Sequence, residues 1–294
     1  MLRLLMIADD FTGALDTGVQ LAAHGIPTQV VVGQADLSAC SSTVLVVDTE
    51  TRHLPAAKAA KAVEELTRSA VENGVGCIYK KTDSALRGNI GAELAALLKA
   101  SGARNLPFLP AFPQIGRTTE KGVHYIKGVP VNESPFGIDP FEPVRCAEVT
   151  KLIHLQTDVP AQSLQPGVVG LDDAVGVCCQ HLFDLCQRSL AVGACPVAGL
   201  QLLRVGISGS VGQMFGALFG SEHLGTLLLT GGDTLLQCMN SVGARELEPV
   251  CELESGIVLA RFTYQGRTRY VITKSGGFGQ EDLLVELADR IAKH

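Results

Sequence analysis

Short apolar runs alternate with helix-like stretches in the first third of the chain. Residues 2–8 are mostly aliphatic and hardly alternate, which is typical of a strand buried on both faces of a parallel sheet. Three later runs share this character, and two stretches rich in Ala, Leu and Glu have helical periodicity. The strands are expected at residues 27–32, 43–48 and 76–80, and the helices at 56–70 and 92–100. This alternation predicts a doubly wound α/β fold with a parallel sheet.

The pattern changes in the rest of the chain. Residues 107–143 are rich in Pro, Gly and Asn without a sustained period, so we expect loops over one end of the sheet. An apolar, helical block follows at residues 168–190. The last third is rich in Gly and predicts strands at 224–229, 256–264 and 269–273 and a closing helix at 281–292. The simplest division is two α/β lobes, residues 1–200 and a smaller lobe of residues 201–294.

Composition limits the class of protein. The chain has 294 residues and a net charge of -6, so we expect no nucleic-acid partner held by bulk electrostatics. Apolar runs all fall short of a membrane span, and residue 1 leads directly into the first strand without a leader pattern. We therefore expect a cytoplasmic protein without a membrane partner. The nine cysteines include no C-x-x-C pair, which argues against a disulfide framework and a zinc ribbon.

Two adjacent aspartates, Asp9 and Asp10, follow the first strand in the stretch IADDFTGA. In open α/β sheets, ligands bind outside the carboxyl ends of the strands, so acids at this place are often functional. A structural role is an equal alternative, because Asp10 or Thr12 would cap the following helix by accepting hydrogen bonds from its free N–H groups.

The stretch YKKTDSALRGN places four charged residues between a strand and a helix: Lys80, Lys81, Asp83 and Arg87. A solvated network of surface charges is the ordinary explanation for such a cluster. The glycines that follow allow close approach of a ligand, and Arg offers a planar fork that suits a carboxylate or a phosphate. We interpret this stretch as a site for a small anion.

The proline-rich stretch LPAFPQIGRTTEKGVHYIKGVPVNES supplies further donors. Its prolines fix local dihedral angles, so Arg117, Lys121, His124 and Asn132 lie on a loop that its own composition keeps stiff. Because polar loops usually bind nothing, this stretch matters only together with the other motifs.

Two glycine turns follow strands in the last third. LLLTGGDTLLQCMN places Gly231 and Gly232 before a helix, where backbone N–H groups and the positive end of the helix favour a phosphate. VITKSGGFGQEDL repeats this arrangement with Gly276 and Gly277, and Lys274 stands at its entrance. Neither turn is a Walker P-loop or a dinucleotide fingerprint. A lone glycine pair is usually a simple turn, but two in one small lobe indicate an adenine-nucleotide site.

Together and in this order, these five stretches resemble the four-carbon acid sugar kinase family, which includes the D-threonate, D-erythronate and 3-oxo-tetronate kinases. The resemblance is close in the first half of the chain and in its last quarter, and weak between them. It implies a sugar-acid domain and a smaller C-terminal ATP domain that face each other across a cleft. Because this chain is shorter than the family pattern before the glycine turns, we expect a shortened nucleotide lobe.

The resemblance also assigns residues to each side of the cleft. The substrate side receives Asp9, Asp10, Lys81, Asp83, Arg87 and Arg117. The nucleotide side receives Gly231, Gly232, Asp233, Thr234, Gly276 and Gly277. To these we add Lys274, because it stands at the entrance of the second glycine turn. The stretch ISGS, with Ser208 and Ser210, stands either for a family Gly-Ser stretch that reaches ATP or for a turn that closes the N-terminal domain.

The implied activity is ATP-dependent phosphorylation of a hydroxyl of a four-carbon sugar acid, with Mg²⁺ bridging the phosphates. Arg87, helped by Lys81 or Arg117, is expected to hold the carboxylate of the acid. The paired aspartates, Asp9 and Asp10, are expected to accept hydrogen bonds from its hydroxyl groups. Asp233 is the first choice for the proton acceptor and Asp10 is the alternative. No metal ligand is indicated.

Two other interpretations compete with a kinase. The chain would be a sugar-acid binding or regulatory module if its shortened lobe has lost phosphotransfer. A dehydrogenase is disfavoured because the dinucleotide fingerprint is absent. In each case except the last, the expected partner is a small-molecule sugar acid, and a homodimer is the candidate assembly.

Overall fold

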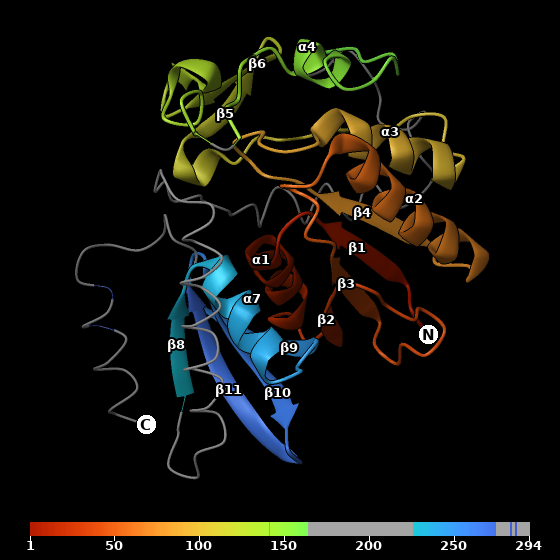
Figure 1. Ribbon diagram of the computed structural model, residues 1–294, viewed down its shortest axis with the longest axis vertical. Helices are drawn as coiled ribbons and strands as arrows, with labels where there is room; N and C mark the ends of the chain where they lie inside the picture. The colour runs from red at the N-terminus through yellow and green to blue at the C-terminus, as the bar shows by residue number, and fades with distance from the viewer. Residues whose placement is uncertain (141, 164–225, 275–282, 284–285, 287–294) are drawn as a thin grey trace.

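The computed structural model describes residues 1–140, 142–163, 226–274, 283 and 286. Among these residues the main feature is an eight-stranded sheet with the order β4-β1-β3-β2-β9-β10-β11-β8 (Figure 1). Its strands are β1 (Leu4–Ala8), β2 (Thr28–Val32), β3 (Val44–Asp48), β4 (Cys77–Lys81), β8 (Thr226–Thr230), β9 (Glu246–Glu254), β10 (Ile257–Tyr264) and β11 (Arg267–Lys274). The helices used below are α1 (Phe11–Ala22), α2 (Ala56–Glu72), α3 (Ile90–Ser101), α4 (Val149–His154) and α7 (Gly232–Ser241).

The first four strands form the predicted parallel sheet. β1 pairs in parallel with β3 and β4, and β2 pairs in parallel with β3. Both faces are covered, because Met6 and Ala8 pack with α1 while Leu5 and Ile7 pack toward α2 and α3. Figure 1 shows α1 on one side of these strands and α2 and α3 on the other. The α/β fold class and the doubly wound first half are therefore confirmed.

Strand β9 joins the two halves of the chain into one sheet. It pairs antiparallel with β2, with Val30 opposite Leu247. One hydrophobic core runs across the join and includes Phe11 of α1 and Met239 of α7. The sequence did not predict β9, because Pro249 interrupts it and proline is disfavoured inside strands. Pro249 lies opposite Ala260, beside an irregularity in the pairing with β10.

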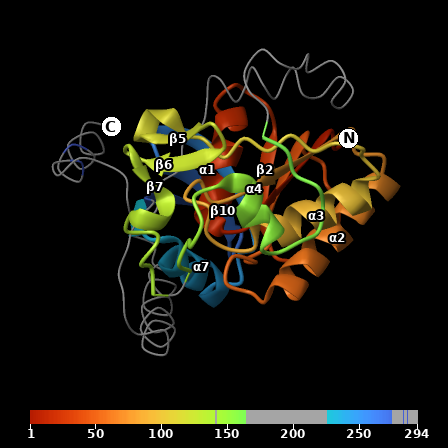
Figure 2. The same ribbon diagram turned by 90° about the horizontal axis from the view of Figure 1, so that it is seen from above.

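A small antiparallel sheet covers the end of the large sheet at which β1 and β4 end (Figures 1 and 2). It consists of β5 (Arg117–Glu120), β6 (Val123–Ile126) and β7 (Val129–Pro130). The prediction of loops throughout residues 107–143 is therefore wrong for this part. Strands of two to four residues are too short to produce a period in the sequence, and Leu86, Ile90 and Val131 form a separate core beneath them.

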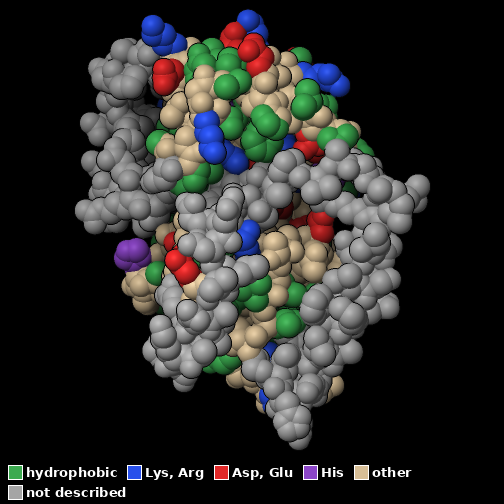
Figure 3. Space-filling model, turned by 90° about the vertical axis from the view of Figure 1, so that its left-hand side faces the viewer, with side chains coloured by type: hydrophobic (Ala, Val, Ile, Leu, Met, Phe, Trp, Pro, Cys, Tyr) green, Lys and Arg blue, Asp and Glu red, His purple; other side chains and the backbone are tan. Residues whose placement is uncertain are grey.

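Several predictions fall on residues outside the described ranges, namely the boundary at residue 200, the helical block at 168–190 and most of the closing helix at 281–292. No helix within the described ranges is long and apolar enough to cross a membrane. On the face shown in Figure 3, the described basic and acidic side chains are interspersed.

Candidate functional site

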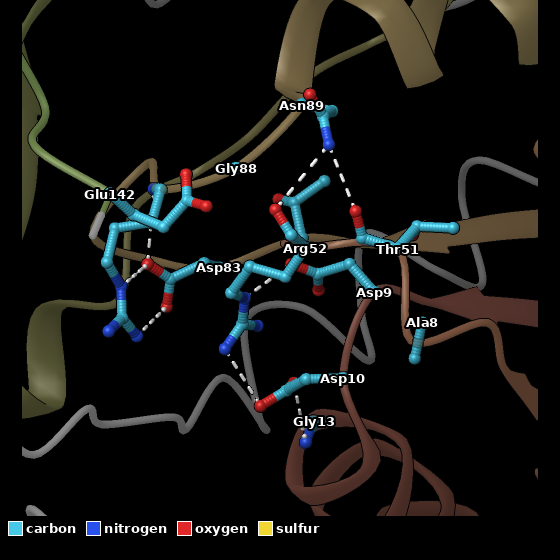
Figure 4. Close-up of polar contacts among 12 residues, drawn as sticks. Ala8, Asp9, Asp10, Gly13, Thr51, Arg52, Asp83, Gly88, Asn89 and Glu142 are labelled. Atoms are coloured by element: carbon cyan, nitrogen blue, oxygen red, sulfur yellow. Dashed lines mark hydrogen bonds and ion pairs between the residues drawn. The ribbon is translucent and has the colours of Figure 1, made fainter. Parts of the chain in front are cut away.

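Polar residues follow the carboxyl ends of three neighbouring strands. Asp9 and Asp10 come after β1, Arg52 comes shortly after β3, and Asp83 comes after β4. Because these strands are parallel neighbours, their carboxyl ends meet at one edge of the sheet, which is where open α/β sheets bind ligands. The close-up in Figure 4 shows these four residues gathered at this edge.

Asp10 caps α1, which was one of the two alternatives from the sequence, and it also belongs to the charged cluster. Its Oδ1 accepts a hydrogen bond from the N–H of Gly13 (3.0 Å), and its Oδ2 accepts from Thr12 Oγ1 (2.7 Å) and from Arg52 (2.8 Å). Burial alone would raise the pKa of Asp10. The charges of Arg52 and Lys81 and the bond from Thr12 outweigh burial and lower that pKa.

Arg52 binds both aspartates, although the sequence analysis did not select it. Its Nε donates to Asp9 Oδ2 at 2.7 Å, and its side chain is only 9% exposed. Asn89 holds the Arg52 loop by donating to the carbonyls of Thr51 (3.0 Å) and Leu54 (2.8 Å). Burial opposes the charged form of Arg52, but the carboxylates of Asp10 and Asp9 raise its pKa well above the usual value.

One carboxylate oxygen of Asp9 accepts no hydrogen bond from the described residues. Oδ2 is bound to Arg52, whereas the buried Oδ1 has no hydrogen-bond donor among the described residues. A buried carboxylate oxygen without a donor is costly for the free protein, and a ligand hydroxyl would satisfy it. Asp9 therefore offers an acceptor at the base of the site.

Asp83 and Arg87 form a closed ion pair. Arg87 donates from Nε to Asp83 Oδ2 at 2.7 Å and from NH2 to Oδ1 at 3.2 Å. Burial alone would raise the pKa of Asp83, but the charges of Arg87 and Arg52 hold it well below the usual value. The planar fork of Arg87 is thus occupied by a carboxylate of the protein itself.

Arg117, on β5, lies beside this pair without a carboxylate of its own. Its NH1 donates to Ser84 Oγ at 2.6 Å, and its guanidinium lies over the ring of Phe136 at 5.1 Å from the centroid. The same ring faces Arg87 at 5.4 Å. His124 holds the backbone of Ser84 in place, since its Nε2 is 2.8 Å from the Ser84 carbonyl oxygen. A carbonyl oxygen only accepts, so this nitrogen carries the proton and donates it.

The two adjacent lysines of β4 point in different directions, as strand geometry requires. Lys80 forms a buried ion pair with Glu93 of α3 at 2.8 Å and has a structural role. Lys81 is buried at the site, and its Nζ donates to the Thr82 carbonyl at 2.7 Å. Burial lowers the pKa of Lys81 despite the opposing charges of Asp9 and Asp10.

The first glycine turn lies against the start of α1. Gly231 adopts a φ of 93°, which favours glycine, and its N–H donates to the Lys274 carbonyl at 3.0 Å. A Cβ at Gly232 would lie 3.1 Å from Thr12 Cγ2, so α7 and α1 begin side by side. Asp233 and Thr234 follow in the first turn of α7. Gly276, Gly277, Ser208 and Ser210 lie outside the described residues.

Two acids that the sequence analysis did not select, Asp48 and Glu50, lie near the charged cluster, and Glu50 also interacts with the charge of Asp233 after the glycine turn. Asp48, which ends β3, is fully buried, and its Oδ1 accepts from the Glu50 N–H at 3.0 Å. Burial and the charge of Glu50 raise the pKa of Asp48 well above the usual value. Burial also raises the pKa of Glu50, and the charges of Asp10 and Asp233 add to this rise. Glu50 therefore lies within electrostatic reach of both the acid cluster and the glycine turn.

Two family models match the chain. A sugar-binding N-terminal domain matches residues 4–192, which is more than half of the chain, and a nucleotide-binding C-terminal domain matches residues 196–284. The chain belongs to the four-carbon acid sugar kinase family. The resemblance stated from the sequence motifs is thereby confirmed, and the cluster at β1, β3 and β4 lies in the sugar-binding domain of this family.

Curated relatives in the family are named for sugar-acid kinases. A D-threonate kinase of Salmonella typhimurium is 39% identical over 54% of this chain and 38% of its own length. A D-threonate kinase of Bordetella bronchiseptica is 34% identical over 76% of this chain and 57% of its own length. Other relatives are named D-erythronate kinase and 3-oxo-tetronate kinase. The chain thus spans between about two fifths and three fifths of the length of these two D-threonate kinases.

A solved structure from Bordetella bronchiseptica has a similar fold. It is 25% identical, has a TM-score of 0.50, and the match covers 98% of both chains. That protein was crystallised with bound citrate as a domain-swapped dimer.

Proposed function

We propose that this protein transfers a phosphoryl group from ATP to a hydroxyl of a four-carbon sugar acid of the threonate, erythronate or 3-oxo-tetronate type. The observation that carries the proposal is the contact between Gly232 and Thr12. This contact brings the glycine turn of the nucleotide-binding domain next to Asp10, which belongs to the charged cluster of the sugar-binding domain. Phosphoryl transfer needs such proximity, because the acceptor hydroxyl must stand in line with the phosphate.

The sugar acid would bind at the carboxyl ends of β1, β3 and β4. Asp9 Oδ1 is the acceptor for one of its hydroxyls, because this oxygen is buried and has no donor among the described residues. The carboxylate of the acid would lie toward the guanidinium groups beside Asp83. Citrate, which is bound to the Bordetella relative, is also a hydroxy acid, and its presence there supports this class of ligand.

ATP would bind with its phosphates at the start of α7. The backbone N–H groups after Gly231 and the positive end of the helix favour an anion there. Mg²⁺, which usually takes one or two protein carboxylates together with substrate phosphates, would neutralise phosphate charge when bound. Glu50 fits this need, because it lies within electrostatic reach of Asp233 in the first turn of α7.

Asp233 remains our proposal for the proton acceptor. Asp10 is the weaker choice, because its carboxylate already accepts three hydrogen bonds and its pKa is lowered. A good general base has a pKa near the working pH, and these bonds move Asp10 away from it.

A homodimer is the proposed assembly, supported by the domain-swapped dimer of the Bordetella relative. One further candidate function has an observation in its favour. The Bordetella relative holds citrate, so binding of a hydroxy acid alone, as in a sugar-acid binding module without phosphotransfer, is the second candidate.

The experiment is a screen for ADP release by the full chain with ATP, Mg²⁺ and a panel of four-carbon acids. We expect turnover with one of these acids and background ADP release with the corresponding neutral polyols. Binding of an acid without any ADP release would refute the kinase and support the binding module.

A further inference from the structure

Arg117 and Arg87 both lie near the proposed sugar acid, and their surroundings differ. We propose that Arg117, rather than Arg87, binds the carboxylate of the substrate and so selects acids over neutral sugars. This assignment rests on the proposed function, since it concerns the same site.

Arg87 has little left to offer a ligand. Its Nε and NH2 hold both oxygens of Asp83, and its NH1 is 3.9 Å from Asp139. Asp83 is only 1% exposed, so this pair is a closed unit. Removing either partner would leave the other charge buried and unpaired, which strongly destabilises the native state. We infer that Arg87 neutralises Asp83 and supports the floor of the site.

Arg117 is a buried cation without an ion-pair partner of its own among the described residues. It is 4% exposed, and in the described part of the chain no carboxylate oxygen lies within the 4.0 Å limit of an ion pair with it. Its one hydrogen bond uses NH1, so Nε and NH2 remain available for a bidentate contact. Burial lowers the pKa of Arg117; the charge of Asp83 opposes this, and the charges of Arg87 and Arg52 lower the pKa further. A substrate carboxylate would supply a charge that is not already bound by Arg87.

The other cations of the cluster are compensated. Arg52 binds Asp9 and Asp10, and Lys81 lies near enough to the same two aspartates for their charges to favour its protonated form. The carboxylate whose charge acts on Arg117 is that of Asp83, and Arg87 already binds both oxygens of Asp83. Arg117 is therefore the cation of the cluster that gains most from an added anion.

The neighbours of Arg117 hold its fork in place. Ser84 fixes NH1, and His124 holds the backbone of Ser84 while its Nδ1 accepts from Thr119 at 2.9 Å. The ring of Phe136 supports the guanidinium through a cation–π contact, and it makes a second such contact with Arg87. A fork that is already oriented loses little side-chain entropy when it binds a small acid.

The test compares Arg117→Met with Arg87→Met by calorimetric titration of D-threonate, D-erythronate and the neutral polyol erythritol without ATP. Loss of a charged hydrogen bond should weaken binding of the acids to Arg117→Met by about 10- to 100-fold and leave the polyol unchanged. Arg117→Lys, which keeps the charge but not the fork, should fall between Arg117→Met and the wild type.

Thermal unfolding without ligand distinguishes the two arginines, because only one of the two substitutions should lower the unfolding temperature. Arg117→Met should unfold at the same temperature as the wild type or higher, because a buried unpaired charge is removed. Arg87→Met should unfold at a lower temperature, because Asp83 loses its partner. Wild-type affinity of Arg117→Met for the acids would overturn the assignment, as would a loss of stability equal to that of Arg87→Met. If the wild type binds an acid through Arg117 but never phosphorylates it, the kinase proposal fails and the assignment stands.

Discussion

The two sides of the proposed site differ in their binding groups: side chains on one side and backbone N–H groups on the other. On the proposed acid side, the binding groups are side chains, and buried ion pairs such as Arg52 with Asp9 keep them in place. On the proposed nucleotide side, the binding groups are backbone N–H groups of the turn at Gly231 and Gly232, with Asp233 in the first turn of the helix that follows. The comparison teaches that the acid side tolerates loss of charge poorly, whereas the nucleotide side tolerates added side chains poorly.

The largest effect is expected from Gly232→Val. A branched side chain would fill the space where the backbone must approach phosphate, and its Cβ alone would lie 3.1 Å from Thr12 Cγ2. Calorimetry should detect no ATP binding, while the affinity for the sugar acid stays that of the wild type.

Gly76→Val provides the matched control, since a Cβ there meets nothing closer than a backbone oxygen at 3.8 Å. It should bind ATP normally. Unchanged ATP affinity in Gly232→Val would remove the glycine turn from the nucleotide site.

The next effect concerns Asp233. Asp233→Asn keeps the size of the side chain but removes its basicity, so turnover should fall by roughly 10²–10⁴-fold, the usual range for general-base catalysis. ATP affinity measured by calorimetry should change little. Intact turnover per bound ATP together with much weaker ATP binding would instead make Asp233 a Mg²⁺ or ribose contact.

A smaller effect is expected from the raised pKa of Asp48. The native pKa of this acid lies above its unfolded value, so the native state holds the proton more tightly and wild-type stability falls as pH rises between the two values. Asp48→Asn cannot ionise, so its stability should not fall in this way and should exceed that of the wild type at the higher pH values.

Urea unfolding at pH 4, 5, 6, 7 and 8 measures this difference. The gain of Asp48→Asn should grow with pH, and parallel stability curves for the two proteins would contradict the raised pKa. The groups that face Asp48 are Glu50 and Asp10, so Glu50→Gln should flatten the same dependence in part.

The smallest effect tests the contact between the two sides. Gly232→Ala places a methyl group against Thr12 Cγ2 and should reduce stability by about 1 kcal/mol, as overpacking does. Thr12→Ser removes that methyl group but keeps the hydroxyl that donates to Asp10. Chemical denaturation of the double variant should show that Thr12→Ser restores most of the loss. Purely additive effects would place the two residues apart.

The fold could be predicted from the sequence where strands are buried on both faces. The four strands of the first half differ from their predicted limits by one or two residues, because aliphatic runs bounded by polar residues have few alternative structures. Strand β9 could not be predicted, since its pairing with β2 depends on a contact between distant parts of the chain. The hydrophobic core shared by α1 and α7 could not be predicted for the same reason, because it too joins distant parts of the chain.

The candidate site was predicted in part. Asp9, Asp10, Lys81, Asp83, Arg87 and Arg117 lie together in the structure, and Gly231 and Gly232 lie beside them. Arg52 and Glu50 were missed, although the polar stretch TETRH after the strand at 43–48 repeats the signal of IADD. The ion-pair partners could not be predicted. Side-chain packing in the folded protein, rather than any sequence pattern, determines that Arg87 pairs with Asp83.

The most direct test of the central claim is transfer of label from ATP carrying ³²P in its γ-phosphate to the sugar acid. Wild-type protein, Mg²⁺, labelled ATP and the acid that binds best in calorimetry are incubated, and the products are separated by chromatography. The proposed function predicts labelled sugar-acid phosphate with the wild type and none with Gly232→Val. Absence of labelled acid from the wild type, under conditions where calorimetry shows both ligands bound, would contradict the claim that the two sides form one phosphotransfer site.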